Sequence, residues 1–94
     1  MTKAEIVAEI ANKTGIEKVT VLATVETMME VIKENMVKGN NVYLRGFGSF
    51  IIKKRAQKTA RNITKNTTII IPEHLVPAFK PAKTFVETIK EHTN

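Results

Sequence analysis

The sequence contains no cysteine, which excludes disulfide bonds, thiolate catalysis and zinc-finger chemistry. It also lacks any long apolar run. The N-terminal Met-Thr-Lys-Ala-Glu leads into mixed polar and apolar residues, without the pattern of a signal peptide or of a membrane-spanning helix. From these two absences we expect a cytoplasmic protein that makes no contact with a membrane.

Convergent catalytic or metal-binding side chains are missing as well. His74 and His92 are isolated near the ends of segments, and Glu73 beside His74 has no third partner. A metal site or a catalytic triad needs several converging groups. Gly46-Phe47-Gly48 lacks the third glycine and the following helix of a dinucleotide-binding loop. The sequence therefore predicts no enzyme activity, no cofactor and no metal.

Acidic residues are nearly absent from the middle of the chain, although the net charge of the whole is only +6. Residues 41–83 contain nine basic residues and one acidic residue, Glu73, whereas residues 1–40 and 84–94 each have a net charge of −1. A surface tuned only for solubility would mix the two signs. The clustered charge favours a polyanionic partner, because a Lys or Arg placed on a phosphate releases condensed counterions.

The N-terminal part is predicted to be helical. With 94 residues, 43% of them hydrophobic, the chain suffices for one folded domain. Thr2 caps a first helix that ends at Gly15, and a longer helix runs from about Lys18 to Lys38. The longer helix has an apolar stripe wide enough for two partners, so we expect a dimer. The stripe consists of Leu22, Val25, Met29, Ile32 and Met36, widened by Val21 and Met28.

The periodicity changes from helical to alternating after residue 40. Alternation predicts strands over residues 42–45 and 49–55, joined by a tight turn at Gly46-Phe47-Gly48. Phe47 and Phe50 are expected to serve the core. Another strand is predicted at residues 69–71, where Pro72 terminates it.

The C-terminal part is predicted to hold a connector and a short helix. Val76–Pro81 is expected to be an extended connector, because residues before proline avoid helical backbone, and a last helix follows from about Ala82 to Glu91. The fold class is therefore α+β: two N-terminal helices, a three-stranded antiparallel sheet with a long protruding β-arm, and a short C-terminal helix. We expect one domain over residues 1–94, with a helical dimerisation part (1–40), a β saddle and arm (41–81) and the C-terminal helix (82–94).

A basic segment with almost no apolar residue covers residues 53–68. Its position between two strands predicts a long hairpin with its turn near Lys65-Asn66. Lys53 and Arg55 share one strand face and Lys54 points the other way. Further cations, Lys58 and Arg61, continue the basic series toward the tip. A ribbon of this width fits a DNA groove.

Aromatic residues are absent from residues 51–78. Proteins that read single strands or RNA stack bases on aromatic side chains. We therefore predict double-stranded DNA as the partner. Binding of structured RNA and docking on an acidic protein remain alternatives.

Three motifs in this order carry a family resemblance: Arg45-Gly46-Phe47-Gly48-Ser49-Phe50, Arg61-Asn62 and Val76-Pro77-Ala78-Phe79-Lys80-Pro81. The chain resembles the bacterial histone-like HU and integration host factor proteins over essentially its whole length. The resemblance implies an intertwined homodimer, or a heterodimer with a paralogue, whose two arms wrap the minor groove of DNA in the nucleoid. It implies an architectural protein that bends or compacts duplex DNA with little sequence specificity. A sequence-preferring host-factor-like subunit is the alternative, which Arg45 and Ser49 keep open.

The resemblance also implies which residues contact DNA. Along the arm these are Lys53, Arg55, Lys58, Arg61, Asn62, Ile63 and Lys65, and beside the saddle they are Lys3, Arg45, Lys80 and Lys83.

One position departs from the family pattern. The arm tip of the family usually reads Arg-Asn-Pro, with the proline wedged between base pairs, and here Ile63 takes its place. Isoleucine is an apolar side chain of the kind that minor-groove benders insert, but it lacks the fixed φ of proline. The tip glycine is also replaced, by Asn66. Ile63 is therefore interpreted as a wedge, with loss of the wedge function as the competing interpretation.

Overall fold

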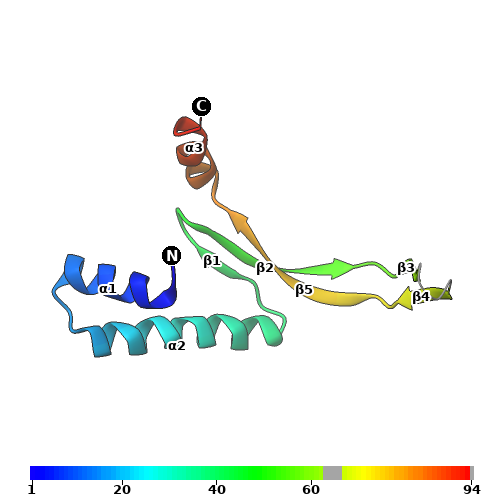
Figure 1. Ribbon diagram of the computed structural model, residues 1–94, viewed down its shortest axis with the longest axis horizontal. Helices are drawn as coiled ribbons and strands as arrows, with labels where there is room; N and C mark the ends of the chain where they lie inside the picture. The colour runs from blue at the N-terminus through cyan, green and yellow to red at the C-terminus, as the bar shows by residue number, and fades with distance from the viewer. Residues whose placement is uncertain (63–66, 94) are drawn as a thin grey trace. The chain divides into compact units, whose positions relative to one another are not determined.

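The computed structural model describes residues 1–62 and 67–93. Two compact units divide the chain, Met1–Asn35 and Met36–Asn94. The elements are α1 (Lys3–Thr14), α2 (Lys18–Val37), β1 (Val42–Leu44), β2 (Gly48–Arg55), β3 (Lys58–Asn62), β4 (Thr67–Ile71), β5 (His74–Pro81) and α3 (Lys83–Glu91). This order confirms the predicted α+β class, and Figure 1 shows the elements along the chain.

The first unit is a helix pair whose ends follow the local sequence signals. Thr2 caps α1, because its hydroxyl accepts a hydrogen bond from the Glu5 N–H at 3.3 Å. Gly15 ends α1 in the left-handed region at φ +75°, a conformation that suits glycine. Of the hydrophobic residues that the structure describes, only Val7 and Val21 are buried. One copy of the chain therefore leaves most of the predicted α2 stripe at least partly exposed.

The second unit is built on a three-stranded antiparallel sheet in the order β1-β2-β5. Its third strand is β5, so the prediction that Val76–Pro81 is only a connector was wrong. Pro77 pairs with Ile52 and Pro81 with Gly48. Prolines are tolerated in β5 because it is an edge strand, where some backbone N–H groups need no partner in the sheet.

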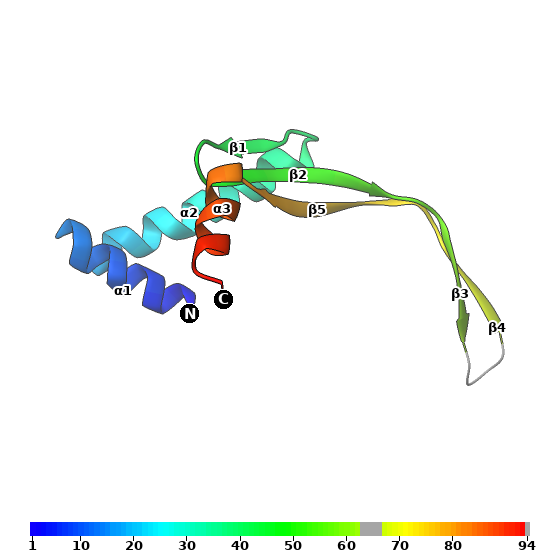
Figure 2. The ribbon, with the colours of Figure 1, turned by 90° about the horizontal axis from the view of Figure 1, so that it is seen from above.

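The arm is a separate two-stranded sheet of β3 and β4, and the Ile69–Ile71 segment pairs there. Residues 56–57 and 72–73 interrupt the two long strands between the sheet and the arm. Figure 2 shows the hairpin bending at this interruption. Pro72 has no N–H to donate to a ladder, which explains why pairing stops there, as the sequence predicted.

A cluster of phenylalanine rings forms the apolar face of the sheet. Phe79 lies 5.1 Å from both Phe47 and Phe50 between ring centroids, and Phe47 stacks on Phe85 of α3 at 5.6 Å. Phe47 and Phe50, which were predicted to serve the core, both belong to this cluster, although Phe47 stays 47% exposed in a single chain. The cluster ties α3 to the sheet.

Gly48 should not tolerate a side chain. A Cβ at this position would lie 2.6 Å from the Phe79 ring and 2.7 Å from the Lys80 carbonyl oxygen, closer than real contacts. We expect Gly48→Ala to lower the free energy of unfolding by about 1–3 kcal/mol through overpacking, measured by chemical denaturation. Gly46→Asn is the control, since nothing lies within 4 Å of its Cβ and asparagine tolerates the positive φ. Equal stability of the two variants would contradict the steric explanation.

Candidate nucleic-acid interface

One face of the three-stranded sheet is polar and cationic, and we call it the cationic face. Alternation along β2 places Lys53 and Arg55 on this face, as predicted, and the register places His74 opposite Arg55. Its members are Tyr43, Ser49, Ile51, Lys53, Arg55, His74, Val76, Ala78 and Lys80. The phenylalanine cluster occupies the opposite face.

Glu73, the single acidic residue of residues 41–83, does not neutralise the cationic face. Glu73 forms an ion pair with Lys54 at 3.0 Å, and Lys54 alternates to the opposite face of β2. Among the described residues, no carboxylate forms an ion pair with Lys53 or Arg55. Lys53 and Arg55 therefore keep their charge available for an external anion.

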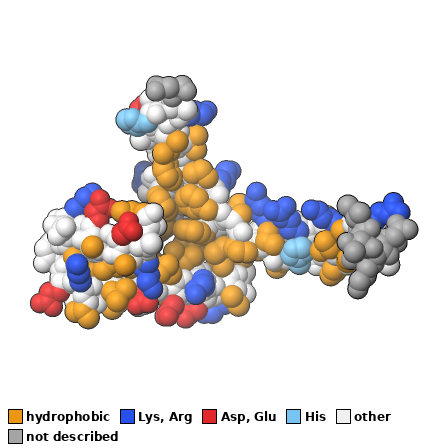
Figure 3. Space-filling model, viewed as in Figure 1, with side chains coloured by type: hydrophobic (Ala, Val, Ile, Leu, Met, Phe, Trp, Pro, Cys, Tyr) orange, Lys and Arg blue, Asp and Glu red, His pale blue; other side chains and the backbone are white. Residues whose placement is uncertain are grey.

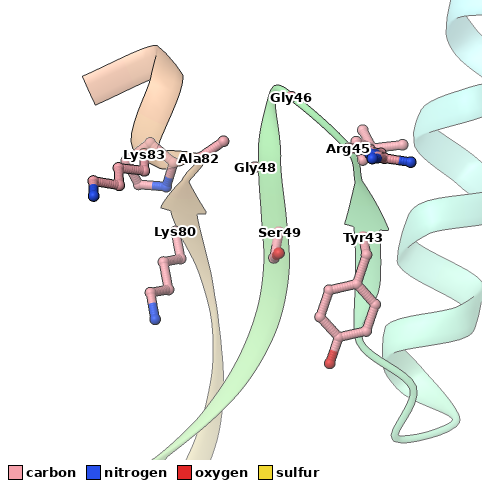
Figure 4. A pocket seen from close by; sticks show the side chains of 10 residues that line it. Tyr43, Arg45, Gly46, Gly48, Ser49, Lys80, Ala82 and Lys83 are labelled. Atoms are coloured by element: carbon pink, nitrogen blue, oxygen red, sulfur yellow. The ribbon is translucent and has the colours of Figure 1, made fainter. Parts of the chain in front are cut away.

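A groove of about 490 Å³ lies at the end of the sheet where β1 turns into β2 and β5 leads into α3. Tyr43, Ser49 and Lys80 lie in a row across β1, β2 and β5, as their register requires (Figure 4). Arg45, in the turn after β1, and Lys83, the first residue of α3, extend outward on either side of this row. The structure thus brings together Arg45, Lys80 and Lys83, three of the residues predicted to contact DNA.

A second groove, of about 500 Å³, lies at the bend between the sheet and the arm. Arg55, Gln57, Lys58 and His74 line it together with two apolar residues. The Nδ1 atom of His74 lies 3.0 Å from the Pro72 carbonyl oxygen, and His74 is the cross-strand partner of Arg55. Arg55 and Lys58, two of the residues predicted to contact DNA, therefore line the same groove at the base of the arm.

The arm does not carry its cations on a single face. Lys58 pairs with Ile71 and Arg61 with Thr68, and the three-residue separation places the two cations on opposite faces of the hairpin. The basic series that the sequence predicted is therefore divided between two faces. Isoleucines 69, 70 and 71 of β4 are all exposed, so apolar surface lies beside the cations. Figure 3 shows Lys and Arg side chains along this hairpin.

Some predicted contact residues lie elsewhere. Lys3 belongs to the helical unit, where it forms an ion pair with Glu26 at 3.1 Å. Asn62 is the last residue of β3. Ile63 and Lys65 lie outside the described residues, as does the turn predicted near Lys65-Asn66.

Sequence reasoning did not identify Tyr43, Gln57 or His74, which line the two grooves, as residues of the candidate interface. His74 was interpreted as an isolated surface histidine, and the structure places it opposite Arg55. The signal for Tyr43 was available in the alternation of residues 42–44, but its neighbours depend on the strand register. Within residues 1–62 and 67–93, no group of three potential metal ligands occurs and no helix is long and apolar enough to span a membrane.

Both the sequence and the fold of this chain are similar to those of known proteins. Residues 1–90 match the family described as bacterial DNA-binding protein. DNA-binding protein HU of Thermotoga maritima is 40% identical over 90 residues, covering 96% of this chain and 100% of that protein. The SPbeta prophage-derived DNA-binding protein HU 2 of Bacillus subtilis is 37% identical over 90 residues, covering 96% and 98%.

Solved structures show the same relationship. HU of Anabaena, in a cocrystal with DNA, is similar with a TM-score of 0.90 at 36% identity, covering 95% of this chain and 97% of that one. HU of Thermotoga maritima is similar with a TM-score of 0.67 at 29% identity, covering 95% and 98%. The chain therefore belongs to the family of bacterial DNA-binding proteins that includes HU.

Proposed function

We propose that this protein is an architectural protein of the nucleoid that binds duplex DNA as a dimer and bends it with little sequence specificity. The observation that carries the proposal is the cationic face. Lys53, Arg55 and Lys80 share this face, and Glu73 forms an ion pair with Lys54, which lies on the opposite face. The same hairpin continues into a charged arm. Such a face matches the phosphate backbone in charge.

The mechanism divides into phosphate neutralisation by the sheet and insertion of the arm into the minor groove. An arm in a groove lies between two phosphate backbones, and Lys58 and Arg61 on opposite faces give each backbone a cation. The exposed isoleucines of β4 suit the apolar sugar edges of the groove. Specificity then arises mainly from how easily a DNA sequence deforms.

The related proteins support this function. The Anabaena HU of similar fold was crystallised with DNA, and the sequence relatives are named DNA-binding protein HU. These names do not favour the alternative of a sequence-preferring host-factor-like subunit.

A bending protein should prefer DNA that is already bent. We expect a pre-bent or nicked duplex to bind at least about tenfold more tightly than a plain duplex of the same length and sequence. The reason is that smooth bending of a 20–30 bp site costs on the order of 1–6 kcal/mol, which a pre-bent duplex does not require. Gel shifts with the three duplexes measure this. Equal affinities would contradict bending, and stronger binding to a structured RNA competitor would indicate RNA as the partner.

Two substitutions near the arm tip distinguish the contribution of DNA bending from the contribution of charge. If Ile63 is a wedge, Ile63→Ala should reduce DNA bending, read by energy transfer between end labels, and leave the salt dependence of binding nearly unchanged. Arg61→Ala should do the opposite: it should weaken binding broadly and lower the salt slope by about one. Unchanged bending in the Ile63→Ala protein would show that the arms bind by charge and groove shape alone.

A further inference from the structure

We propose that Tyr43 is an additional DNA-binding residue, which donates its phenolic O–H to a phosphate oxygen while Asn41 holds it in position. This inference rests on the proposed function, because it assumes that duplex DNA covers the cationic face. Neither residue was among the contacts implied by the family resemblance.

The position of Tyr43 places it in the interface. Tyr43 lies on the cationic face, opposite Ser49, which in turn is opposite Lys80 (Figure 4). It is 71% exposed, so its ring and hydroxyl are accessible to a ligand that covers this face. Lys80 and Tyr43 lie two strands apart, so we expect a DNA backbone that covers this face to contact both side chains.

Asn41 determines whether the Tyr43 hydroxyl donates or accepts in the hydrogen bond between the two side chains. The backbone N–H of Ile52 donates to Oδ1 of Asn41 at 3.1 Å, so the oxygen of this amide must point toward β2. The Nδ2 atom is then the end that faces the tyrosine, and it lies 3.4 Å from the phenolic oxygen. Since an amide nitrogen can only donate, the Tyr43 oxygen is the acceptor in this contact.

The phenolic hydrogen is therefore available for an external acceptor. A tyrosine hydroxyl has one hydrogen to donate, and the contact with Asn41 uses only an oxygen lone pair. Accepting a hydrogen bond also polarises the O–H group and makes it a better donor. Because the surrounding face is cationic, the acceptor that it selects is an anion, and a phosphate oxygen of the DNA backbone fits both the charge and the hydrogen-bonding direction.

Tyr43 can report on its own environment, because the chain has one tyrosine and no tryptophan. We expect a saturating random-sequence duplex to protect Tyr43 fluorescence from quenching by acrylamide, a neutral quencher that the charged face does not attract. The anisotropy of a label on the same DNA follows binding independently. At a salt concentration where the anisotropy shows no binding, the protection should disappear.

The hydroxyl is tested by a double-mutant cycle. Tyr43→Phe keeps the ring and should weaken duplex binding by roughly 10-fold to 150-fold, the range for one hydrogen bond to a charged acceptor, without changing the salt slope. Asn41→Asp retains the acceptor for the Ile52 N–H but replaces the donor that faces Tyr43. The phenol should then donate to the carboxylate and lose its contact with DNA. Adding Tyr43→Phe to the Asn41→Asp protein should therefore cause no further loss of affinity.

The outcomes distinguish the two levels of the proposal. If labelled duplex does not bind the unaltered protein at low salt, both the proposed function and the role of Tyr43 are wrong. If the duplex binds while Tyr43 stays fully accessible to acrylamide, Tyr43 lies outside the interface and the function stands. If Tyr43→Phe leaves binding by the original protein unchanged, the hydroxyl makes no contact with DNA. If Tyr43→Phe weakens binding equally in the original and Asn41→Asp proteins, with unchanged thermal unfolding, the residue at position 41 does not control the hydroxyl and the positioning role of Asn41 is wrong.

Discussion

Raising the salt concentration from about 50 to about 200 mM should weaken binding to random duplex DNA by a factor of about 10³–10⁵. The expectation assumes that a bound dimer neutralises roughly 6–10 phosphates, which the cations of two sheets and two arms can supply. Each neutralised phosphate releases condensed counterions, and added salt opposes that release. Fluorescence anisotropy of a labelled duplex over a series of salt concentrations gives the slope directly.

The chain offers a matched pair of variants for this measurement. Lys53→Gln should lower the salt slope by about one for each bound copy, because Lys53 lies on the cationic face without an acidic partner among the described residues. Lys54→Gln removes the same charge one residue away and should change the slope little, because Lys54 faces the other side and pairs with Glu73. A flat salt titration of the unaltered protein would contradict the mechanism, and equal effects of the two variants would contradict the assignment of the face.

The second large effect concerns association of the chain with itself. Sedimentation at micromolar concentration should give twice the chain mass of 10.5 kDa. Only Val7 and Val21 are buried hydrophobic residues among those the structure describes, while Met28 and Met29 are 48% and 42% exposed. A monomer would therefore present an apolar surface of the kind that marks an interface or an aggregation site. The melting temperature should also rise with protein concentration, because association stabilises the folded chain by mass action.

Charge substitutions on α2 test the predicted dimer interface. Met29→Glu should raise the dimer dissociation constant on the order of 100-fold, because burying a polar group without a partner costs about 2–7 kcal/mol. Val19→Glu is the control: Val19 is 70% exposed, lies away from the apolar stripe, and its position in the first turn of the helix suits a negative charge. A stable, folded monomer of the unaltered chain would contradict the dimer.

Features set by short stretches of chain could be predicted from the sequence. Thr2 and Gly15 mark the ends of α1 because capping depends on groups within a few residues. The shared face of Lys53 and Arg55 follows from the alternation of a single strand, and the contrast between a nearly neutral N-terminal part and a basic arm needs only the order of charges. These local features were sufficient to indicate a DNA-binding class before any fold was known.

Features that depend on which strands pair, and in which register, were decided by the tertiary structure. The residues from Val76 to Pro81 have the local preferences of a connector, and they form a strand because β2 offers an unpaired edge. Register also determines that His74 lies opposite Arg55 and that Tyr43 lies in line with Ser49 and Lys80. A shift of the pairing by one residue would move every one of these side chains to the other face of the sheet, because successive residues of a strand point to opposite sides. Sequence thus determined which side chains the interface can use, and pairing between distant segments determined which of them stand together.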